Sequence, residues 1–237
     1  MSLSKLVTIV IPFKNEEKYI GNLLDDLALQ HGIEDVSIYL ADGNSTDRSI
    51  EVINSKKNYF TNLQIIQGGS VSEGRNNGAR LATTPFICFI DADVKLYSKD
   101  TLLMAYMKAS KFNLITCKLR CYSGNLLTKV GFRVFNIVHS ILSKRYPFAV
   151  GTFFFVNSEM FKKYGMFNVN NDTSEDFLFS QNFKPSEFAI LKTYVGQDDR
   201  RIEKMGYFGM VKYLTYNFYK FLKNDLNHFN IKTKYWD

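Results

Sequence analysis

Cysteine is scarce in this chain of 237 residues, and its few copies form no recognisable pattern. The three cysteines are Cys88, Cys117 and Cys121, an odd number without a CxxC pair. Cys88 and Cys117 lie in apolar segments, so we expect buried free thiols and a reducing compartment. A framework of disulfide bonds is therefore not expected.

Long apolar runs are also missing. No run approaches the roughly 18 residues that a membrane-spanning helix needs, and no signal-peptide pattern opens the chain. We find no internal repeat and no low-complexity linker. We therefore expect one domain over residues 1–237, in the cytoplasm or at the inner face of a membrane.

Tryptophan occurs once, whereas there are 21 phenylalanines and 14 tyrosines. The hydrophobic share of 46% is high enough for a substantial core and disfavours a disordered chain. The net charge of +7 is uneven, because residues 200–237 hold eight Lys/Arg and three Asp/Glu. A basic end suggests phosphate groups or an anionic surface as a partner, although a solvated basic face explains the charge equally well.

The first half of the chain alternates between strand and helix patterns. We expect strands at residues 6–13, 35–41, 63–67 and 86–90, and helices at 16–30, 46–57 and 70–82, the last opened by a Ser70–Glu73 capping box. Apolar strands that alternate with helices predict an α/β fold, with a mostly parallel sheet covered on both faces. Such sheets bind ligands beyond the carboxyl ends of their strands, where polar or glycine-rich segments lie here.

The second half follows another pattern. Strands are expected at 113–119 and 149–157, with short helices starting near 174 and 200. A helix over 125–144 has a polar stripe (Lys129, Arg133, Asn136, Ser140, Ser143) opposite an apolar row (Leu127, Val130, Val134, Val138, Ile141). Residues 207–223 form an aromatic helix with Lys212, Tyr216, Lys220 and Lys223 on one stripe; it could cover the core, contact a second subunit or lie on a membrane.

Asp91 and Asp93 directly follow a buried strand. Residues two apart on a strand face the same way, so both carboxylates can bind one cation, and Mg²⁺ and Mn²⁺ prefer oxygen ligands. A D-x-D sequence is common by chance, and a polar turn explains it as well. The pair alone therefore leaves both interpretations open.

Other candidate residues have ordinary structural explanations too. Segment 42–47 reads as a turn and helix cap, which leaves Asp42 without an obvious partner. Arg75 lies in the first turn of a helix, where the dipole disfavours a cation, so an anionic ligand explains it better. Glu175 and Asp176 suit either a helix N-terminus or a general base. The glycines at 68–78 match neither a Walker nor a Rossmann motif.

Four segments together resemble family 2 glycosyltransferases of the GT-A fold: VTIVIPFKNEEKYIGNLLDDL, LADGNSTDRSIEVI, EGRNNGARLATTPFICFIDADV and GTFFFVNSEMFKKYGMFN…SEDFLFSQNF. Their order and spacing match over about residues 6–206. The resemblance implies an inverting enzyme that moves a sugar from a nucleotide diphosphate, UDP favoured, to an acceptor hydroxyl. It implies a divalent metal (Mn²⁺ or Mg²⁺), a sugar or lipid-linked sugar as acceptor, and a role in cell-surface polysaccharide synthesis.

The resemblance also assigns roles to residues. Residues matching nucleotide-sugar positions are Pro12, Phe13, Asn15, Glu16, Asp42, Arg75 and Asp91, with Gly151 and Thr152 near the donor sugar and acceptor. Asp93, with Asp91, matches the metal ligands. Asp176 matches the catalytic base, with Glu175 beside it. Residues 1–95 are then the nucleotide-binding half, 96–206 the acceptor and catalytic half, and 207–237 a helical tail.

This chain departs from the family pattern at two places. Gly43 stands where many members have a second aspartate, and the Q-x-x-R-W motif of processive members is absent, which favours single transfer. Gln197 to Arg201 is a faint echo of that motif, and Arg200 and Arg201 could help to hold a diphosphate.

The alternatives are a nucleotidyltransferase of similar architecture and a nucleotide- or nucleic-acid-binding protein without activity. Nucleic acid is not expected as a partner, because acids lie at three of the four strand ends. A homodimer stays open.

Overall fold

The computed structural model describes residues 2–170 and 174–222. Its strands are β1 (Val7–Phe13), β2 (Ser37–Asp42), β3 (Leu63–Gln67), β4 (Phe86–Phe89), β5 (Lys95–Leu96), β6 (Leu114–Cys121), β7 (Phe154–Asn157) and β8 (Phe188–Gln197). Its α-helices are α1 (Ile20–Ala28), α2 (Ser49–Lys56), α3 (Val71–Leu81), α4 (Thr101–Lys108), α5 (Leu126–Leu142), α6 (Ser158–Lys163), α7 (Glu175–Ser180) and α8 (Arg200–Leu222). Two short 3₁₀ turns, Lys57–Tyr59 and Pro185–Glu187, complete the described elements.

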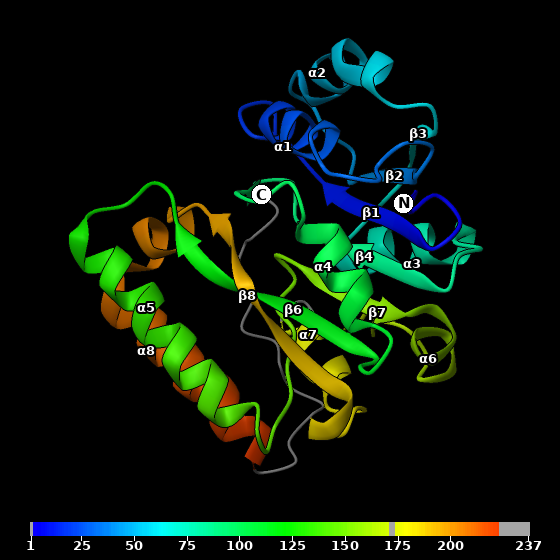
Figure 1. The fold of residues 1–237 in the computed structure, drawn as a ribbon. Coiled ribbons are helices and arrows are strands. Elements are labelled where there is room, and N and C mark those ends of the chain that lie inside the picture. Colours follow the sequence, from blue (N-terminus) through cyan, green and yellow to red (C-terminus); the bar gives the residue numbers. More distant parts are fainter. Residues whose placement is uncertain (1, 171–173, 223–237) are drawn as a thin grey trace.

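All eight strands form one sheet in the order β3-β2-β1-β4-β7-β6-β8-β5 (Figure 1). The pairs β1–β2, β2–β3, β1–β4 and β6–β8 are parallel, whereas β7 is antiparallel to β4 and β6, and β5 to β8. The four strands predicted in the first half are therefore confirmed as a parallel unit. The predicted α/β class with a mostly parallel sheet is confirmed as well.

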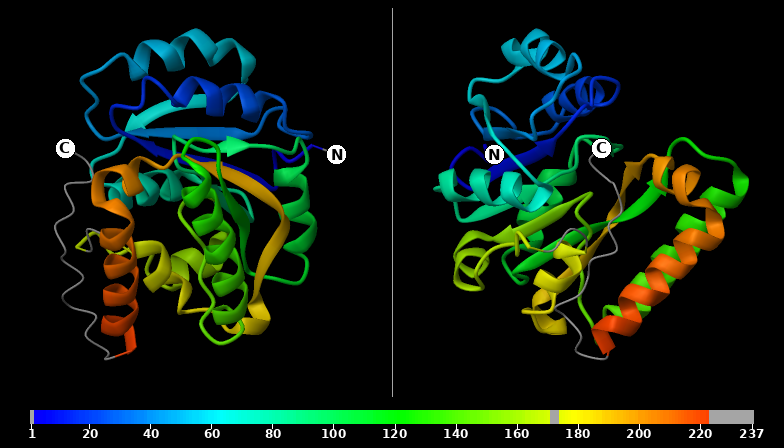
Figure 2. Two further views of the ribbon diagram at one scale, coloured as in Figure 1. Left: turned by 90° about the vertical axis from the view of Figure 1, so that its left-hand side faces the viewer. Right: turned by 180° about the vertical axis from the view of Figure 1, so that it is seen from behind.

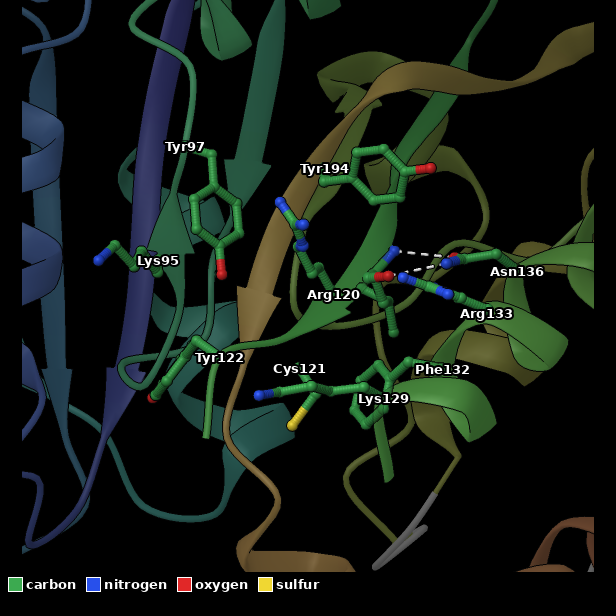
Figure 3. Close-up of a pocket in the computed structure, with 11 residues that line it drawn as sticks. Lys95, Tyr97, Arg120, Cys121, Tyr122, Lys129, Phe132, Arg133, Asn136 and Tyr194 are labelled. Atoms are coloured by element: carbon green, nitrogen blue, oxygen red, sulfur yellow. Dashed lines mark hydrogen bonds between the residues drawn. The ribbon is translucent and has the colours of Figure 1, made fainter. Parts of the chain in front are cut away.

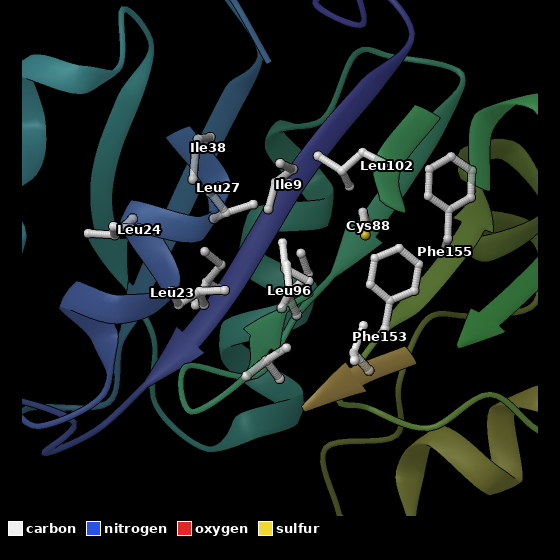
Figure 4. Packing of buried hydrophobic residues seen from close by; sticks show 14 of the residues in the cluster. Ile9, Leu23, Leu24, Leu27, Ile38, Cys88, Leu96, Leu102, Phe153 and Phe155 are labelled. Atoms are coloured by element: carbon white, nitrogen blue, oxygen red, sulfur yellow. The ribbon is translucent and has the colours of Figure 1, made fainter. Parts of the chain in front are cut away.

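The first face of the sheet is aliphatic and lies under α1, α2 and α4. Alternate residues of β1, Val7, Ile9, Ile11 and Phe13, pack there because successive side chains of a strand point to opposite faces. Figure 4 shows Leu23, Leu24 and Leu27 of α1 beside Ile9 and Ile38. Cys88 lies in this cluster, and all three cysteines are free and buried, as predicted.

The second face is aromatic and lies under α3, α6 and α7. Phe89 and Phe154 from the sheet meet Phe161, Phe167 and Phe179, with ring centroids 4.8–6.1 Å apart. Tilted and edge-to-face pairs of this kind add stability beyond their buried area. Much of the large phenylalanine content is therefore used to cover this face.

The bounds of two strands need comment. β1 ends at Phe13, as expected, and Pro12 lies inside it, paired with Ala41. β4 pairs with β1 only as far as Val10, so the missing N–H of proline leaves no partner in β4 unsatisfied. β7 begins at Phe154 rather than at residue 149, because Val150 and Phe153 form a separate bridge. No sequence pattern had indicated β5, β8, α4 or α6.

The two long helices α5 and α8 lie at the end of the molecule away from α1 and α2 (Figures 1 and 2). The helices predicted at 125–144 and after residue 200 are confirmed, and the second is interrupted at Gly206 (φ 69°). Tyr207 hydrogen-bonds Thr128 and Asn125 at one end of α5, and Tyr146, just beyond the other end, contacts the Phe218 ring. Lys223 and the rest of the tail lie outside the described residues.

The apolar row of α5 faces outward. Its five side chains, Leu127, Val130, Val134, Val138 and Ile141, are 41–60% exposed. Polar residues of the same helix are turned inward: Thr128 and His139 are buried, and the Asn136 side chain bonds both the N–H and the carbonyl of Leu119. Phe132 and Phe135 of the same helix pack against the core, so α5 has apolar residues on both sides and leaves an apolar surface at this end of the molecule.

Among the described residues, no helix combines the length and apolarity needed to cross a bilayer.

Candidate active site

The loops after β1 and β2 interlock at the carboxyl edge of the sheet. Asn15, which has a positive φ of 56°, accepts a hydrogen bond from the N–H of Thr46 (2.8 Å) and donates its own N–H to Ser45 (3.1 Å). The N–H of Glu16 donates to the hydroxyl of Ser49 (2.8 Å). Because Pro12 and Phe13 are buried, only their main chain can face a ligand here. The loop after β1, which contains the predicted nucleotide-sugar residues Asn15 and Glu16, is thus hydrogen-bonded to the loop after β2.

Asp42 does have a partner, contrary to the sequence-based reading. Its Oδ1 accepts the N–H of Ser45 (2.9 Å) and so closes the turn after β2. The neighbouring Gly43 donates its N–H to the carbonyl of Phe13 (2.7 Å), and a Cβ there would lie 3.0 Å from the carbonyl oxygen of Gly69. An aspartate at position 43 would therefore need the Gly69 segment to move.

Arg75 joins the first half of the site to the second. Its side chain is 3% exposed; Nη2 donates to Oδ1 of Asp91 (2.6 Å) and Nη1 donates to Oε1 of Glu175. Its guanidinium also lies over the Phe167 ring, 5.5 Å from the centroid. The sequence suggested an anionic ligand as the partner of Arg75. In the structure its partners are carboxylates of the protein itself, those of Asp91 and Glu175.

Asp176 lies beside this bridge at the start of α7. Its Oδ2 accepts the main-chain N–H of Gly151 (2.7 Å). A Cβ on Gly151 would overlap Nη2 of Arg75, so only a glycine at this position leaves room for the guanidinium. Thr152 is buried, and its hydroxyl has no hydrogen-bond partner among the described residues. The structure thus brings Asp91, Glu175, Asp176 and Gly151 together around one arginine.

Asp93 belongs to a second charged cluster. Arg200, the first residue of α8, donates to Oδ2 of Asp93 (2.7 Å) and to both carboxylate oxygens of Glu16 (3.2 Å each). Its guanidinium lies 4.4 Å from the Tyr19 ring centroid, and the phenol of Tyr122 donates to the main-chain carbonyl of Asp93 (2.9 Å). The D-x-D pair is therefore flanked by two arginines, one on each carboxylate.

Burial sets the protonation of these carboxyl groups. It raises the pKa of Glu16 to about 7, although Arg200 opposes the shift. Burial, and then the charge of Asp91, also raises the pKa of Asp93, and burial raises the pKa of Glu175 in spite of Arg75. Burial alone would lower the pKa of Arg75, but Asp91, Glu175 and Asp176 raise it, so this group stays charged. Closely spaced, poorly solvated carboxyls favour a cationic ligand.

These carboxylates suit a hard divalent cation. Asp93 shares Arg200 with Glu16, and both Asp91 and Asp93 act electrostatically on Glu16. No group of three or more His, Cys, Asp or Glu in the part of the chain that the structure describes is close enough to enclose a metal. Mg²⁺, however, is typically held by one or two carboxylates together with substrate phosphates. The donor set fits that mode of binding.

The sequence matches the model of Glycosyl transferase family 2 over residues 8–165, about two thirds of the chain. The chain belongs to this family. The nucleotidyltransferase alternative is accordingly not favoured.

Two curated relatives are similar in sequence to part of this chain. A poly(ribitol-phosphate) beta-glucosyltransferase of Bacillus spizizenii is 27% identical over 79% of the chain, and a 4,4'-diaponeurosporenoate glycosyltransferase of Staphylococcus aureus is 32% identical over 61%. The chain covers only 31% and 42%, respectively, of these relatives.

Solved structures support the GT-A fold. A mannosyltransferase from Pyrobaculum calidifontis, in complex with GDP-Man and Mn²⁺, has a TM-score of 0.69 at 19% identity, covering 85% of this chain and 58% of that one. S. aureus TarS 1-349 has a TM-score of 0.63 at 22% identity, covering 82% and 60%. The predicted family and fold are therefore confirmed.

Several residues of the site were not predicted from the sequence. Arg200 was named only as one of two arginines that could hold a diphosphate, and no role was predicted for Tyr19 or Tyr122. Tyr122 follows β6 and meets Asp93 only because β8 brings the two segments together. No local sequence signal could have identified it.

Proposed function

We propose that this protein is an inverting glycosyltransferase that moves a sugar from a nucleotide diphosphate to an acceptor hydroxyl in single transfers. The observation that carries the proposal is the Arg75 bridge, which joins Asp91 of the D-x-D to Glu175 beside Asp176. In a family 2 chain, these are the acids expected at the two ends of the reacting bond. The sequence motifs and the geometry therefore support the same pair of carboxylate groups.

UDP-sugars are the favoured donors, and cell-surface glycans the favoured products. TarS has been crystallised with UDP-GlcNAc, although the mannosyltransferase holds GDP-Man. The Bacillus relative acts, by its name, on poly(ribitol-phosphate). Residues up to about 95 would bind the donor through the loops at Asn15, Glu16 and Asp42, and residues 96–206 would bind the acceptor.

Asp93 and Asp91 would hold Mn²⁺ or Mg²⁺, which neutralises charge on the leaving diphosphate. Arg200 lies on Asp93 and Glu16 with 35% of its side chain exposed, so its guanidinium is placed to bind diphosphate oxygens. Arg75 is too buried for extensive ligand contact. We assign Arg75 chiefly to positioning Asp91 and Glu175, in addition to the place near the nucleotide that the family resemblance implies.

Asp176 would act as the general base. The N–H of Gly151 holds one carboxylate oxygen, and an acceptor hydroxyl within hydrogen-bond reach of the carboxylate would lose its proton to it. The hydroxyl oxygen then attacks the anomeric carbon opposite the leaving diphosphate, and a single displacement inverts the configuration. Thr152 follows Gly151 and is as buried as Arg75, so we assign it to the wall near the donor sugar and acceptor rather than to extensive ligand contact.

Calorimetry with UDP and GDP, each with and without Mn²⁺ or Mg²⁺, tests the donor assignment. We expect metal-dependent binding that Asp93→Asn weakens at least tenfold. Asp176→Asn should retain this binding and lose nearly all transfer. Nucleotide binding that is absent, or independent of metal, would overturn the proposed function, and unchanged turnover of Asp176→Asn would remove Asp176 as the base.

We further propose that the exposed apolar side chains of α5 and α8 contact an anionic membrane surface. Phe208 (84% exposed), Val211 and Leu214 of α8 add to the apolar row of α5. Residues 126–146 contain four Lys/Arg and no acid, and within α8 only Glu203 is acidic. Apolar side chains beside cations are typical of helices that lie in a membrane interface. A cytoplasmic location at the inner membrane face would follow, and the acceptor could then be lipid-linked.

A further inference from the structure

A second cleft lies outside the candidate active site, between α5 and the neighbouring strands. It has a volume of about 580 Å³ and is lined by residues of β5, β6, β8 and α5 and of the segments that follow β5 and β6 (Figure 3). Four cationic side chains border it: Lys95, Arg120, Lys129 and Arg133. None of the nucleotide or catalytic residues assigned above lines it.

The described part of the cleft itself holds no carboxylate that pairs with its cations. None of its lining residues is acidic, and among the described residues none of the four cations takes part in an ion pair. Two acids act at its margins: Asp26 accepts the N–H of Leu96 (2.8 Å) and interacts electrostatically with Lys95, and Asp199 acts electrostatically on Cys121. Four like charges around one hollow repel one another, so an anion bound there would relieve that repulsion.

An aromatic ring contacts two of these four cations. The Arg120 guanidinium lies 5.7 Å, and Lys95 Nζ 5.8 Å, from the centroid of the Tyr97 ring. Figure 3 shows Arg120 between Tyr97 and Tyr194. Cation–π contacts orient a charge without cancelling it. Because the cations keep their charge and tyrosines stand beside them, the cleft offers both anion binding and polar, flat surfaces for a carbohydrate or polyol.

The cleft shares a wall with the metal-binding loop. Tyr122, which lines it, donates its hydroxyl to the carbonyl of Asp93 (2.9 Å). Gly196 of β8 lies beneath this wall: a Cβ there would come within 2.9 Å of the Tyr122 ring and 3.1 Å of the Tyr97 hydroxyl. Tyr122 therefore contacts both the cleft and Asp93 of the D-x-D.

We propose that this cleft binds the phosphate group of a phosphorylated polyol or sugar that serves as acceptor. The proposal rests on the proposed transferase function, whose acceptor it specifies. A phosphate dianion matches a group of cations that have no ion-pair partner among the described residues, and arginine pairs with phosphate oxygens in a bidentate manner. The tyrosines then contact the polyol or sugar that carries the phosphate.

Binding is tested first without donor or metal, on the full chain. We expect glycerol 3-phosphate to bind, measured by calorimetry or NMR titration, and glycerol not to bind. Arg120→Gln on β6 and Arg133→Gln on α5 should each weaken binding at least fivefold. Arg80→Gln is the matched control, because Arg80 is also exposed but lies on α3, where it contacts Asn77 (2.7 Å). All three side chains are exposed, so the variants should fold, which circular dichroism verifies.

The result that overturns the proposal is glycerol 3-phosphate binding that is absent, equal to that of glycerol, or unchanged in both cleft variants. Phosphatidylglycerol vesicles separate the two sources of phosphate: vesicle binding that needs Arg120 and Arg133, without any binding of soluble glycerol 3-phosphate, also overturns the acceptor assignment.

Transfer assays separate this proposal from the proposed function. With a phosphorylated acceptor, Arg120→Gln should raise the acceptor KM at least fivefold and leave kcat and the donor KM nearly unchanged. If no donor supports transfer but glycerol 3-phosphate binding still depends on Arg120 and Arg133, the anion site stands and the transferase function fails.

Discussion

Gly151 is the residue on which the geometry around Arg75 depends most directly. A Cβ at this position would overlap the Arg75 guanidinium, which is fixed by Asp91, Glu175 and the Phe167 ring. We expect Gly151→Ala to lower the free energy of unfolding by about 1–3 kcal/mol, as overpacking does, and to reduce transfer more than tenfold. Urea denaturation and a transfer assay measure the two effects.

Gly131 on α5 provides the matched control for that substitution. A Cβ there meets no atom within 4 Å, so Gly131→Ala should raise stability by up to about 1 kcal/mol through helix propensity alone. Activity should be unchanged. If Gly151→Ala behaved like Gly131→Ala, Arg75 could shift freely, and the positioning role assigned to it would be wrong.

His139 should make stability depend on pH. Burial lowers the pKa of this side chain to about 4, although its hydrogen bond to the carbonyl of Phe148 (2.8 Å) opposes the shift. An unfolded histidine has a pKa near 6.5. Between these values the unfolded chain binds the proton and the folded chain does not, so the contribution of His139 is complete above about pH 7 and is lost as the pH falls toward 4.

At pH 5 this loss amounts to about 2 kcal/mol relative to pH 7, from 1.36 kcal/mol per pKa unit. His139→Gln cannot take up the proton, so its free energy of unfolding should fall less over this range. Urea denaturation of both proteins at pH 5 and pH 7 makes the comparison. Parallel losses in the two proteins would contradict the assignment to His139.

At the level of single elements, α3 combines a predictable start with an unpredicted environment. Ser70 accepts the N–H of Glu73 (3.3 Å), and the Glu73 carboxylate accepts the N–H of Ser70 (2.7 Å), as the S-x-x-E sequence predicted. We expect Ser70→Ala to lower the free energy of unfolding by about 1 kcal/mol. Ser110→Ala, at an exposed site after α4 that caps no helix start, should change it much less. Equal effects in urea denaturation would show that the cap adds nothing.

The elements also show how far sequence patterns reach. Local signals sufficed for the parallel unit β1–β4, because each strand is a short run rich in apolar residues that ends in a polar or glycine-rich loop, although β3 at the sheet edge is largely exposed. They did not indicate β8, whose FAILKTYVGQ sequence mixes polar and apolar residues because β8 is buried only in part. They also suggested nothing of the outward-facing apolar row of α5, since periodicity identifies two faces of a helix but not which one is covered.

The same limit explains the candidate site. Asp91, Asp93, Glu175 and Asp176 were found from short motifs, since each pair follows or begins one element. The arginines that hold them could not be placed in this way: Arg75 meets Glu175 across 100 residues, and Arg200 meets Glu16 across 184. Such contacts depend on the strand order of the whole sheet, which no local pattern encodes.

For the molecule as a whole, the asymmetric charge and the apolar end at α5 and α8 predict binding to anionic membranes. We expect the full chain to sediment with vesicles that contain phosphatidylglycerol, and much less with phosphatidylcholine alone. High salt should weaken the binding, because the basic residues interact through a screened potential. The neutral vesicles thus measure the apolar contribution by itself.

Two substitutions on the outer surface of α5 test which surface is involved. Ile137 and Ile141 are 61% and 60% exposed, so the double variant Ile137→Ser/Ile141→Ser should fold normally. It should bind vesicles at least tenfold more weakly, because full burial of an isoleucine contributes about 1.5–3 kcal/mol. Met107→Ser on α4, with 67% exposure, is the control and should bind as the wild type does. Unchanged sedimentation of the double variant would exclude this surface. Loss of a dimer in light scattering, with no vesicle binding by any variant, would instead show that a second copy of the chain covers it.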